Sequence, residues 1–413
     1  MTNPQATSFS PRGYRALLRN PPYRTLLCSS MLIHFGFGLY LTVLPWLVLE
    51  VTGSKSAVGW ATTARFLPYL LLSIPLGTLV DRFDRRRVMI ASNWISALLA
   101  AAVPVLHLAG ALRGWHVLVT AFLLSTFGLP IYLARVAALP QIVAKDNIVT
   151  ANSASMVLLG LSLMGGTALI GPVVDTLGLA NSFSIYAAVL VVSALVLTRL
   201  ELPARTGQER AEDGLGPRDL LQGISYVLSD PVVRAVFLLD ALYFGLANGM
   251  VMTGMPLFVR DVLGGGPEVH GRILVLGNVG MLFGSLWLGR FGRHLPKGRV
   301  ITVCWMGYGL ALLCQTLFST LEPVLVASFF VGMIGNLIPV TASSLLQEQV
   351  PPELLGRVFG VWNMIAPGWG SFSGGIAGTL ARTLPATGLI ALGAAISCGN
   401  AMLARLSKLW HQE

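Results

Sequence analysis

The feature that most limits how this chain can fold is a series of long apolar segments. Along its 413 residues, about twelve runs reach the ~20 residues that a helix needs to cross a bilayer. Hydrophobic residues make up 54% of the chain and charged residues only 11%, whereas soluble domains carry roughly 45–50% and 25%. Because lipid offers the backbone no hydrogen-bond partner, such segments are expected to span as helices. The sequence therefore predicts an all-α polytopic membrane protein.

The spans are predicted to form two groups of six on either side of a polar linker. The stretch 201–219 is rich in Gly, Pro and mixed charge, as linkers are. After it, the helical spacing of Leu220, Leu221, Ile224 and Val227 indicates a short amphipathic helix. We expect a cytoplasmic N-terminal segment (1–25), an N-terminal six-helix bundle (26–200), a cytoplasmic linker with an amphipathic helix (201–231), and a C-terminal six-helix bundle with a short tail (232–413). The spans are predicted near 26–49, 57–80, 88–110, 116–138, 152–174, 180–200, 232–257, 270–289, 300–319, 322–345, 357–381 and 386–406.

The distribution of basic residues predicts the orientation. The first twenty residues are polar, so we expect no secretory signal peptide. Lys and Arg gather in cytoplasmic loops, and most of them fall on the side that holds both predicted termini. This indicates a multi-pass protein of the cell inner membrane (the cytoplasmic membrane) with both termini cytoplasmic. The net charge of +10 follows from that orientation, so no nucleic-acid partner is expected. The four cysteines lie in apolar runs without paired spacing, which favours packing roles over disulfides or metal binding.

The two halves of the chain show signs of an internal repeat. The stretch 77–79 near the end of the second span matches 284–286 near the end of the eighth, 207 positions later. The loops after the fourth and tenth spans repeat at the same offset, where Val143 corresponds to Val350. Parallel repeats of six spans are the plan of transporters that rock two bundles about a central site.

The loop after the second span reads "GTLVDRFDRRRV" and resembles the signature of the major facilitator superfamily. Together with the six-plus-six plan, this resemblance implies the major facilitator fold, with 12 transmembrane helices in two pseudo-symmetric six-helix bundles around a central cavity. The stretches "LPWLVLEVTGS", "LPQIVAKDNIVTANS" and "LLQEQVPPELLGRVFGVWN" resemble the drug and siderophore exporters related to the enterobactin exporter and the macrolide efflux proteins. The resemblance covers nearly the whole chain.

The loop motif is expected to act as a gate. Gly77 removes a side chain where two helices approach closely. Asp81 follows at the cytoplasmic end, where the resemblance places it against the start of the eleventh span, and a carboxylate at a helix N-terminus is favoured by ~0.3–1 kcal/mol. That contact exists only when the cytoplasmic side is closed. The alternative is that these are ordinary topology-determining charges. The basic members of the motif are Arg82, Arg85, Arg86 and Arg87.

Charged side chains within spans cost ~2.5–3.5 kcal/mol on insertion scales, so each is a candidate functional residue. Asp240 in the seventh span is the leading candidate for proton coupling, because desolvation favours the protonated form of a carboxyl group; structural pairing is the alternative. His34 occupies the equivalent place in the first span, so the two are predicted to face one cavity, although a core histidine is the alternative. Arg65 in the second span is expected to hold an anionic substrate or to pair with an acid.

Aromatic side chains in four spans are expected to line an apolar substrate chamber, since ligand sites are mostly apolar with few polar anchors. Packing in the core or at the lipid interface is the alternative for each of them alone. The candidates are Tyr40, Trp46, Trp60, Tyr243, Phe244, Trp362 and Trp369.

Other classes of protein lack their motifs in this chain. There is no G-x-x-x-x-G-K-[ST] loop for an ATP-driven pump, and no G-x-S-x-G or H-E-x-x-H motif for a membrane hydrolase. We therefore expect a monomeric secondary transporter without enzymatic activity, metal or cofactor, driven by the proton gradient. Its predicted function is export of an amphipathic small molecule (a siderophore, another secondary metabolite or a drug) by proton antiport with alternating access. Import, or proton symport, of a small anionic solute is the alternative.

Overall fold

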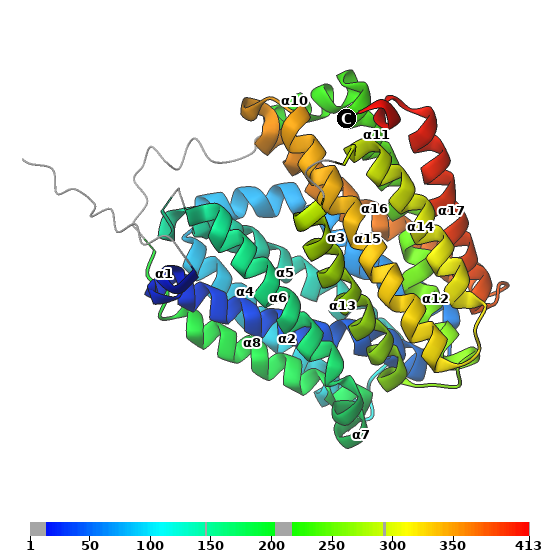
Figure 1. Cartoon of the computed structure of the whole chain (residues 1–413). Helices are drawn as coiled ribbons and strands as arrows, with labels where there is room; N and C mark the ends of the chain where they lie inside the picture. The colour runs from blue at the N-terminus through cyan, green and yellow to red at the C-terminus, as the bar shows by residue number, and fades with distance from the viewer. Residues whose placement is uncertain (1–13, 145–146, 203–216, 292–294, 413) are drawn as a thin grey trace, which may run out of the picture.

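The computed structural model describes residues 14–144, 147–202, 217–291 and 295–412, and these form helices joined by short turns (Figure 1). The first half contains α1 (Tyr14–Arg19), α2 (Pro21–Thr52), α3 (Lys55–Arg82), α4 (Arg85–Leu108), α5 (Gly114–Ile142), α6 (Ile148–Ala168), α7 (Ile170–Asn181) and α8 (Phe183–Leu197). The second half contains α10 (Pro217–Ser229), α11 (Pro231–Leu242), η2 (Tyr243–Asn248), α12 (Gly249–Asp261), α13 (Pro267–Phe291), α14 (Lys297–Thr316), α15 (Leu321–Gln349), α16 (Pro352–Leu380), α17 (Ala386–Leu406) and η4 (Lys408–His411). The described residues contain no strand, which confirms the all-α class.

Local signals fix where the long helices begin and end. Asn20 caps α2 by accepting a hydrogen bond from the Tyr23 backbone, and Asp230 caps α11 in the same way from two backbone N–H groups. Gly53 ends α2 in the left-handed region, at φ 63°, where a glycine carries no steric penalty. Thus α3 can begin two residues later and run back alongside α2.

Two of the predicted spans are interrupted. The fifth was predicted as one span near 152–174, but the chain there forms two helices, α6 and α7, which are bent by 65° at a break after Ala168. The seventh consists of α11, the π-helical segment η2 and α12. A π-helical turn inserts an extra residue into the helix and often marks a functional site.

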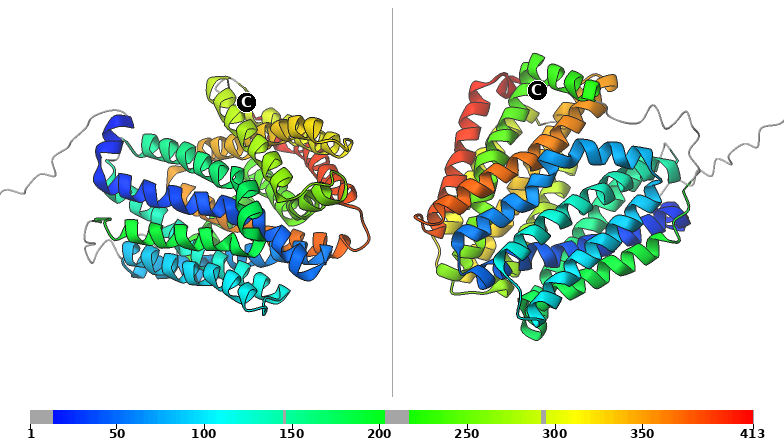
Figure 2. Two further views of the ribbon diagram at one scale, coloured as in Figure 1. Left: turned by 90° about the horizontal axis from the view of Figure 1, so that it is seen from below. Right: turned by 180° about the vertical axis from the view of Figure 1, so that it is seen from behind.

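The helices form two bundles (Figure 2), and equivalent pairs of helices are in contact within each bundle. By length and composition, seven helices of the described residues can cross a membrane, or eight when the bent pair α6–α7 counts as one span; α3, α8, α14 and α16 complete the two groups. In the first bundle α2 packs on α6, and α4 on α5 and α8. In the second, η2 and α12 pack on α16, and α14 on α15 and α17. The same pairs of positions touch in both halves, as a duplicated bundle requires.

The bundles meet at one end and separate at the other (Figure 1). Near the start of α3, Thr63 Oγ1 donates a hydrogen bond of 2.8 Å to the carbonyl oxygen of Ser371 on α16. Near the far end of α3, Leu79 is exposed, and a Cβ added to Gly77 would meet nothing within 4 Å. Helices α6 and α13 behave alike, touching around Gly271 and standing apart where Leu286 is 72% exposed. The open end is the one that carries α1, α10 and the C-terminus.

Candidate functional site

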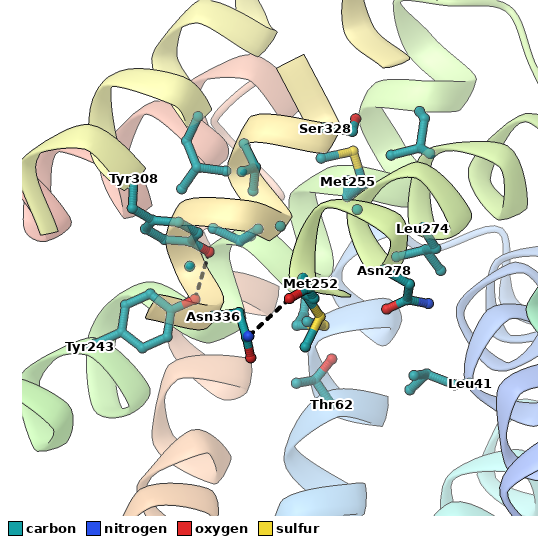
Figure 3. A pocket seen from close by; sticks show the side chains of 18 of the residues that line it. Leu41, Thr62, Tyr243, Met252, Met255, Leu274, Asn278, Tyr308, Ser328 and Asn336 are labelled. Carbon is teal, nitrogen blue, oxygen red and sulfur yellow. Dashed lines mark hydrogen bonds between the residues drawn. The ribbon is translucent and has the colours of Figure 1, made fainter. Parts of the chain in front are cut away.

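A cavity of about 630 Å³ lies between the two bundles. Its lining comes from α2, α3 and α6 of the first bundle and from α11 to α16 of the second, with the second bundle contributing most of it (Figure 3). The volume falls within the ~300–1,000 Å³ typical of small-molecule sites. Most lining side chains are aliphatic, aromatic or methionine, and the polar ones are widely spaced. Such a surface can accept an amphipathic ligand.

An aromatic cluster forms one wall of this cavity. The Tyr243 ring centroid lies 5.3 Å from that of Phe244, 5.0 Å from that of Trp305 and 5.8 Å from that of Tyr308. The hydroxyl groups of Tyr243 and Tyr308 are 2.8 Å apart and hydrogen-bonded, as Figure 3 shows. Tyr243 and Phe244 are adjacent in sequence and open the π-helical segment η2, whose irregular pitch brings both of these neighbours into the lining.

Asp240 is the buried acid of this site. It lies at the end of α11, three residues before Tyr243, and is only 7% exposed. The Trp362 indole Nε1 donates a hydrogen bond of 2.7 Å to its Oδ2. Among the described residues, no Lys or Arg forms an ion pair with Asp240, so the cost of burying its charge is only partly offset. Protonation, or a bound ligand with a donor group, removes that cost.

Arg65 on α3 contributes positive charge from the first bundle. It lines the same cavity as Asp240. Its guanidinium carbon lies 4.6 Å from the centroid of the Phe66 ring, within cation–π range. No carboxylate among the described side chains pairs with it. The cavity therefore presents an acid on one bundle and a base on the other.

The structure divides the sequence-predicted site residues into two groups. Arg65, Asp240, Tyr243, Phe244 and Trp362 lie in the lining of one cavity. The described lining does not include the other candidates for the cavity. Of these, Trp60 and Trp369 are exposed, at 46% and 43%; the rest are His34, Tyr40 and Trp46.

His34, Tyr40 and Trp46 each have a partner of their own. His34 Nδ1 is 2.8 Å from the carbonyl oxygen of Ser30 on its own helix. Tyr40 stacks on Tyr186 inside the first bundle, with ring centroids 5.4 Å apart. Trp46 Nε1 donates a hydrogen bond of 3.2 Å to His270 Nδ1 on the second bundle. The expectation that His34 and Asp240 face one cavity is therefore not met, because the described lining around Asp240 does not include His34.

Several lining residues were not singled out from the sequence. They are uncharged or placed near a span end, and include His270, Asn278, Gln315 and Asn336. Asn336 Nδ2 donates to the carbonyl oxygen of Met281 and to Ser285 Oγ, at 3.0 and 2.7 Å. Amide side chains inside apolar runs are stabilised by such partners, and Asn336 is half-buried. Polar residues within predicted spans were therefore a usable signal.

The loop motif lies at the open end of the molecule. Arg85 Nη1 donates a hydrogen bond of 2.7 Å to the Ala137 carbonyl oxygen on α5, and Arg86 bonds the Thr198 carbonyl oxygen after α8. The Asp84 side chain caps α4 by accepting from the Arg87 backbone. These contacts fix the start of α4 within the first bundle. The side chain of Asp81 lies outside the described residues, so its predicted contact with the eleventh span stays a prediction.

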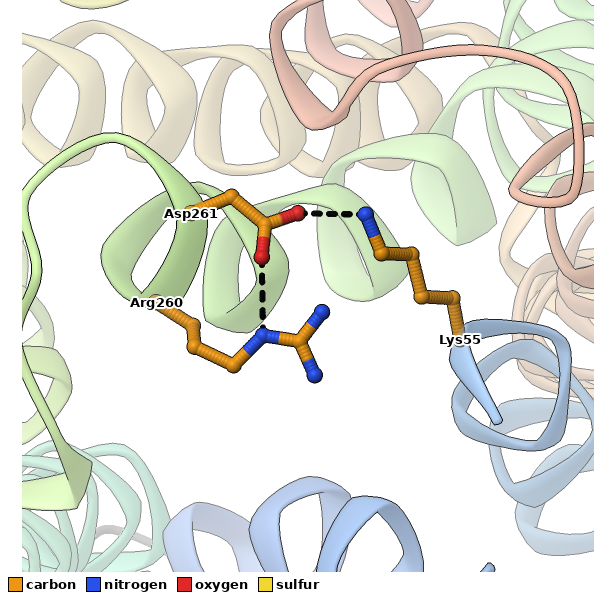
Figure 4. A network of polar contacts seen from close by, with 3 residues as sticks. All are labelled: Lys55, Arg260 and Asp261. Carbon is orange, nitrogen blue, oxygen red and sulfur yellow. Dashed lines mark hydrogen bonds and ion pairs between the residues drawn. The ribbon is translucent and has the colours of Figure 1, made fainter. Parts of the chain in front are cut away.

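Polar contacts also join the two bundles at the end where they meet. Lys55 Nζ at the start of α3 lies 2.6 Å from Asp261 Oδ2 at the end of α12 (Figure 4). Arg260 Nε, from the same helix as Asp261, lies 2.8 Å from the other carboxylate oxygen. The Trp46–His270 hydrogen bond crosses between the bundles at the same end. These contacts would have to break before the bundles could part there.

Two six-helix bundles that share a central cavity and separate at one end define a membrane transporter. The chain belongs to the Major Facilitator Superfamily, whose family model matches residues 26–375. It is 28% identical over 368 residues to the multidrug efflux pump Tap of Mycolicibacterium fortuitum, covering 87% of this chain and 89% of the relative. It is 25% identical over 351 residues to macrolide efflux protein A of Streptococcus pyogenes, covering 82% of each. The resemblance to drug exporters is thereby confirmed.

Solved structures of the same fold are more distant in sequence. The nucleoside transporter NupG matches with a TM-score of 0.73 at 13% identity, covering 93% of this chain and 98% of that chain. A bacterial homolog of the human lysosomal transporter Spinster, in an inward-facing and unoccupied conformation, matches with a TM-score of 0.68 at 12% identity and covers 97% of both chains. At these identities the matches establish the fold alone.

Proposed function

We propose that this protein exports amphipathic small molecules across the cytoplasmic membrane by proton antiport with alternating access. The observation that carries the proposal is the inter-bundle cavity, which combines an aromatic wall with the buried carboxyl of Asp240. The relatives named as multidrug and macrolide efflux proteins support export of a large apolar substrate. A monomer would suffice, since one chain supplies the whole cavity.

The sidedness follows from the basic residues. With both termini in the cytoplasm, the open end faces the cytoplasm and the closed end, with Lys55 and Asp261, faces outward. The structure then corresponds to an inward-facing state, ready to take substrate from the cytoplasm or from the inner leaflet. Asp240 has no ion-pair partner among the described residues, and its one described hydrogen-bond donor is Trp362, so it can exchange a proton for a ligand.

The test is transport by purified protein in liposomes with erythromycin as the probe. In liposomes that hold the protein with its cytoplasmic side outward, an acidic interior should drive uptake of the probe. Uptake of the probe should in turn move protons out of the liposomes. Asp240→Asn should reduce gradient-driven uptake by at least tenfold, because an amide cannot carry a proton. Asp240→Glu, which keeps the carboxyl group, should retain part of the activity.

Two results would contradict this proposal. Uptake that persists unchanged after the gradient is collapsed would exclude proton antiport. Equal uptake by the Asp240→Asn variant would remove that residue from coupling.

Import of a small anionic solute is a second candidate function, favoured by one observation. Arg65 lines the cavity and pairs with no described carboxylate, so it can hold an anionic group. Mass spectrometry of the medium and extract of a deletion strain and its parent, in high and low iron, separates the directions. A compound retained inside the deleted cells indicates export, and iron dependence would indicate a siderophore. A compound left unused in the medium indicates import.

A further inference from the structure

Trp362 lies on α16, the helix of the second bundle that packs against α3 of the first, and it binds the buried carboxyl of Asp240. Its indole Nε1 donates the 2.7 Å hydrogen bond to Asp240 Oδ2, and no other described residue donates one to this carboxyl. A hydrogen bond to an ionised carboxylate is roughly twice as strong as one to a neutral group. The bond therefore weakens when Asp240 binds a proton. Trp362 also lines the cavity, so a ligand can compete with it for the same oxygen atoms.

Helix α16 makes one set of contacts with α3 of the first bundle and another with α10 of the second, and Trp362 lies between the two sets. On its outer half, Thr63 of the first bundle donates to the Ser371 carbonyl oxygen, and a Cβ added to Gly368 would lie 3.2 Å from Leu70 Cα. On its inner half, a Cβ added to Gly223 of α10 would lie 2.8 Å from the Arg357 carbonyl oxygen. Trp362 lies between these regions, five residues after Arg357 and six before Gly368. It is thus placed to hold the inner half of α16 away from the first bundle.

We propose that Trp362 is a positioning residue that locks the empty, unprotonated transporter in the inward-open state. This inference rests on the proposed proton antiport through Asp240. An antiporter must change state when it carries substrate or a proton, but not when it carries neither, because an empty crossing lets protons leak inward without export. The charged carboxylate holds Trp362, and with it α16, in the arrangement seen here. A proton or a substrate releases that hold.

The first experiment measures proton leak in proteoliposomes without substrate, using an internal pH-sensitive dye and an imposed gradient. Trp362→Phe keeps an aromatic ring but removes the donor, and should raise the leak by about tenfold, the factor that corresponds to about 1.4 kcal/mol. Trp362→Tyr, which restores a donor, should leak less than Trp362→Phe. Trp94→Phe changes an exposed tryptophan of α4 and should match the wild type.

Adding Asp240→Asn to Trp362→Phe should abolish the extra leak, since no proton carrier remains. A leak in Trp362→Phe equal to that of the wild type would overturn the lock.

The second experiment reads the conformation directly and does not require the Trp362 variant to fold. Spin labels at Met156 of α6 and Leu286 of α13, both exposed at the open end, report the separation of the bundles once the four native cysteines are replaced. The empty wild type should be inward-open at alkaline pH, and Asp240→Asn should show a mixture of open and closed states at every pH. An Asp240→Asn protein that stays as open as the alkaline wild type would overturn the inference.

The two failures can be told apart. If the wild type exports erythromycin without moving protons, the proposed antiport fails, and the lock fails with it. If the wild type couples normally while Trp362→Phe shows neither extra leak nor a shifted conformation, only the role of Trp362 is lost.

Discussion

At the scale of single residues, the energetic cost of charge in lipid was the most informative sequence signal. Asp240 and Arg65 were singled out because a charged side chain within a span is costly to insert and is therefore a candidate functional residue. Both line the cavity. The same reasoning did not place His34, Tyr40 or Trp46, because a membrane helix is apolar on all its faces and its periodicity does not show which face points to the cavity. The rotation of each helix is set by packing in three dimensions, which one sequence does not display.

The paired hydroxyls of Tyr243 and Tyr308 lead to a prediction about stability. Tyr243→Phe leaves the Tyr308 hydroxyl without its 2.8 Å partner and should cost about 1 kcal/mol, the net worth of such a bond. In a double-mutant cycle, the Tyr243→Phe/Tyr308→Phe protein should lose less than the sum of the single losses. Thermal unfolding in detergent provides the measurement.

Tyr40→Phe is the matched control for this cycle. The Tyr40 hydroxyl is buried and has no hydrogen-bond partner among the described residues, so its removal should be neutral or slightly stabilising. Additive losses for Tyr243 and Tyr308 would show that their hydroxyl groups do not interact.

At the scale of elements, the helical class and the six-plus-six plan could be predicted, but the π-helical segment could not. Length and hydropathy locate a span to within a few residues. The 65° bend between α6 and α7 has a local signal, because Pro172 lies three residues after Leu169 and cannot donate a backbone hydrogen bond to the preceding turn. The π-helical segment Tyr243–Asn248 contains no proline and depends on contacts with neighbouring helices, such as the hydrogen bond from the Gly249 backbone to Ser373 Oγ. Tertiary packing, not local propensity, decides such features.

The crossing of α3 and α16 offers a paired test of close packing. A Cβ added to Gly374 would lie 2.7 Å from the Thr63 backbone nitrogen and 2.9 Å from the Gly59 carbonyl oxygen, and backbone atoms cannot move aside easily. Gly374→Ala should therefore force the outer ends of the bundles apart, at about 1–3 kcal/mol. Gly375→Ala is the control, since its Cβ would meet only side-chain atoms at 3.4 Å or more.

Spin labels at the open end would measure both alanine variants. A loss of the inward-open population in Gly374→Ala but not in Gly375→Ala is expected. Equal populations in the two proteins would mean that this crossing does not control the equilibrium between states.

At the scale of the whole molecule, the state of the transporter depends on contacts that join the bundles at the closed end. The Lys55–Asp261 pair is partly exposed, with side chains 40% and 28% accessible, so its own contribution is modest, at ~0–1 kcal/mol. Arg260 remains beside Asp261 whichever way the bundles move. The pair therefore biases the equilibrium between states without fixing it.

Charge reversal at this pair should shift that equilibrium. Lys55→Glu places two acids together and should lower the inward-open population by about two- to fivefold. This range corresponds to the ~0.4–1 kcal/mol of interaction free energy that an exposed ion pair contributes. The exchanged pair, Lys55→Asp with Asp261→Lys, should recover most of it, and high salt should reduce the difference by screening. Labels at the open end report the populations. Reversal without effect at low salt would exclude a gating role for the pair.

The unequal lining of the cavity bears on how such a protein changes its substrates over generations. Most of the side chains that would touch a ligand come from α11 to α16, while the first bundle supplies a smaller part of the wall, including Arg65. The two halves therefore contribute unequally to the wall of the cavity. In laboratory selection for resistance to a new compound, substitutions that change substrate specificity should therefore accumulate in the second half of the gene. The first half should remain under selection for the conformational change.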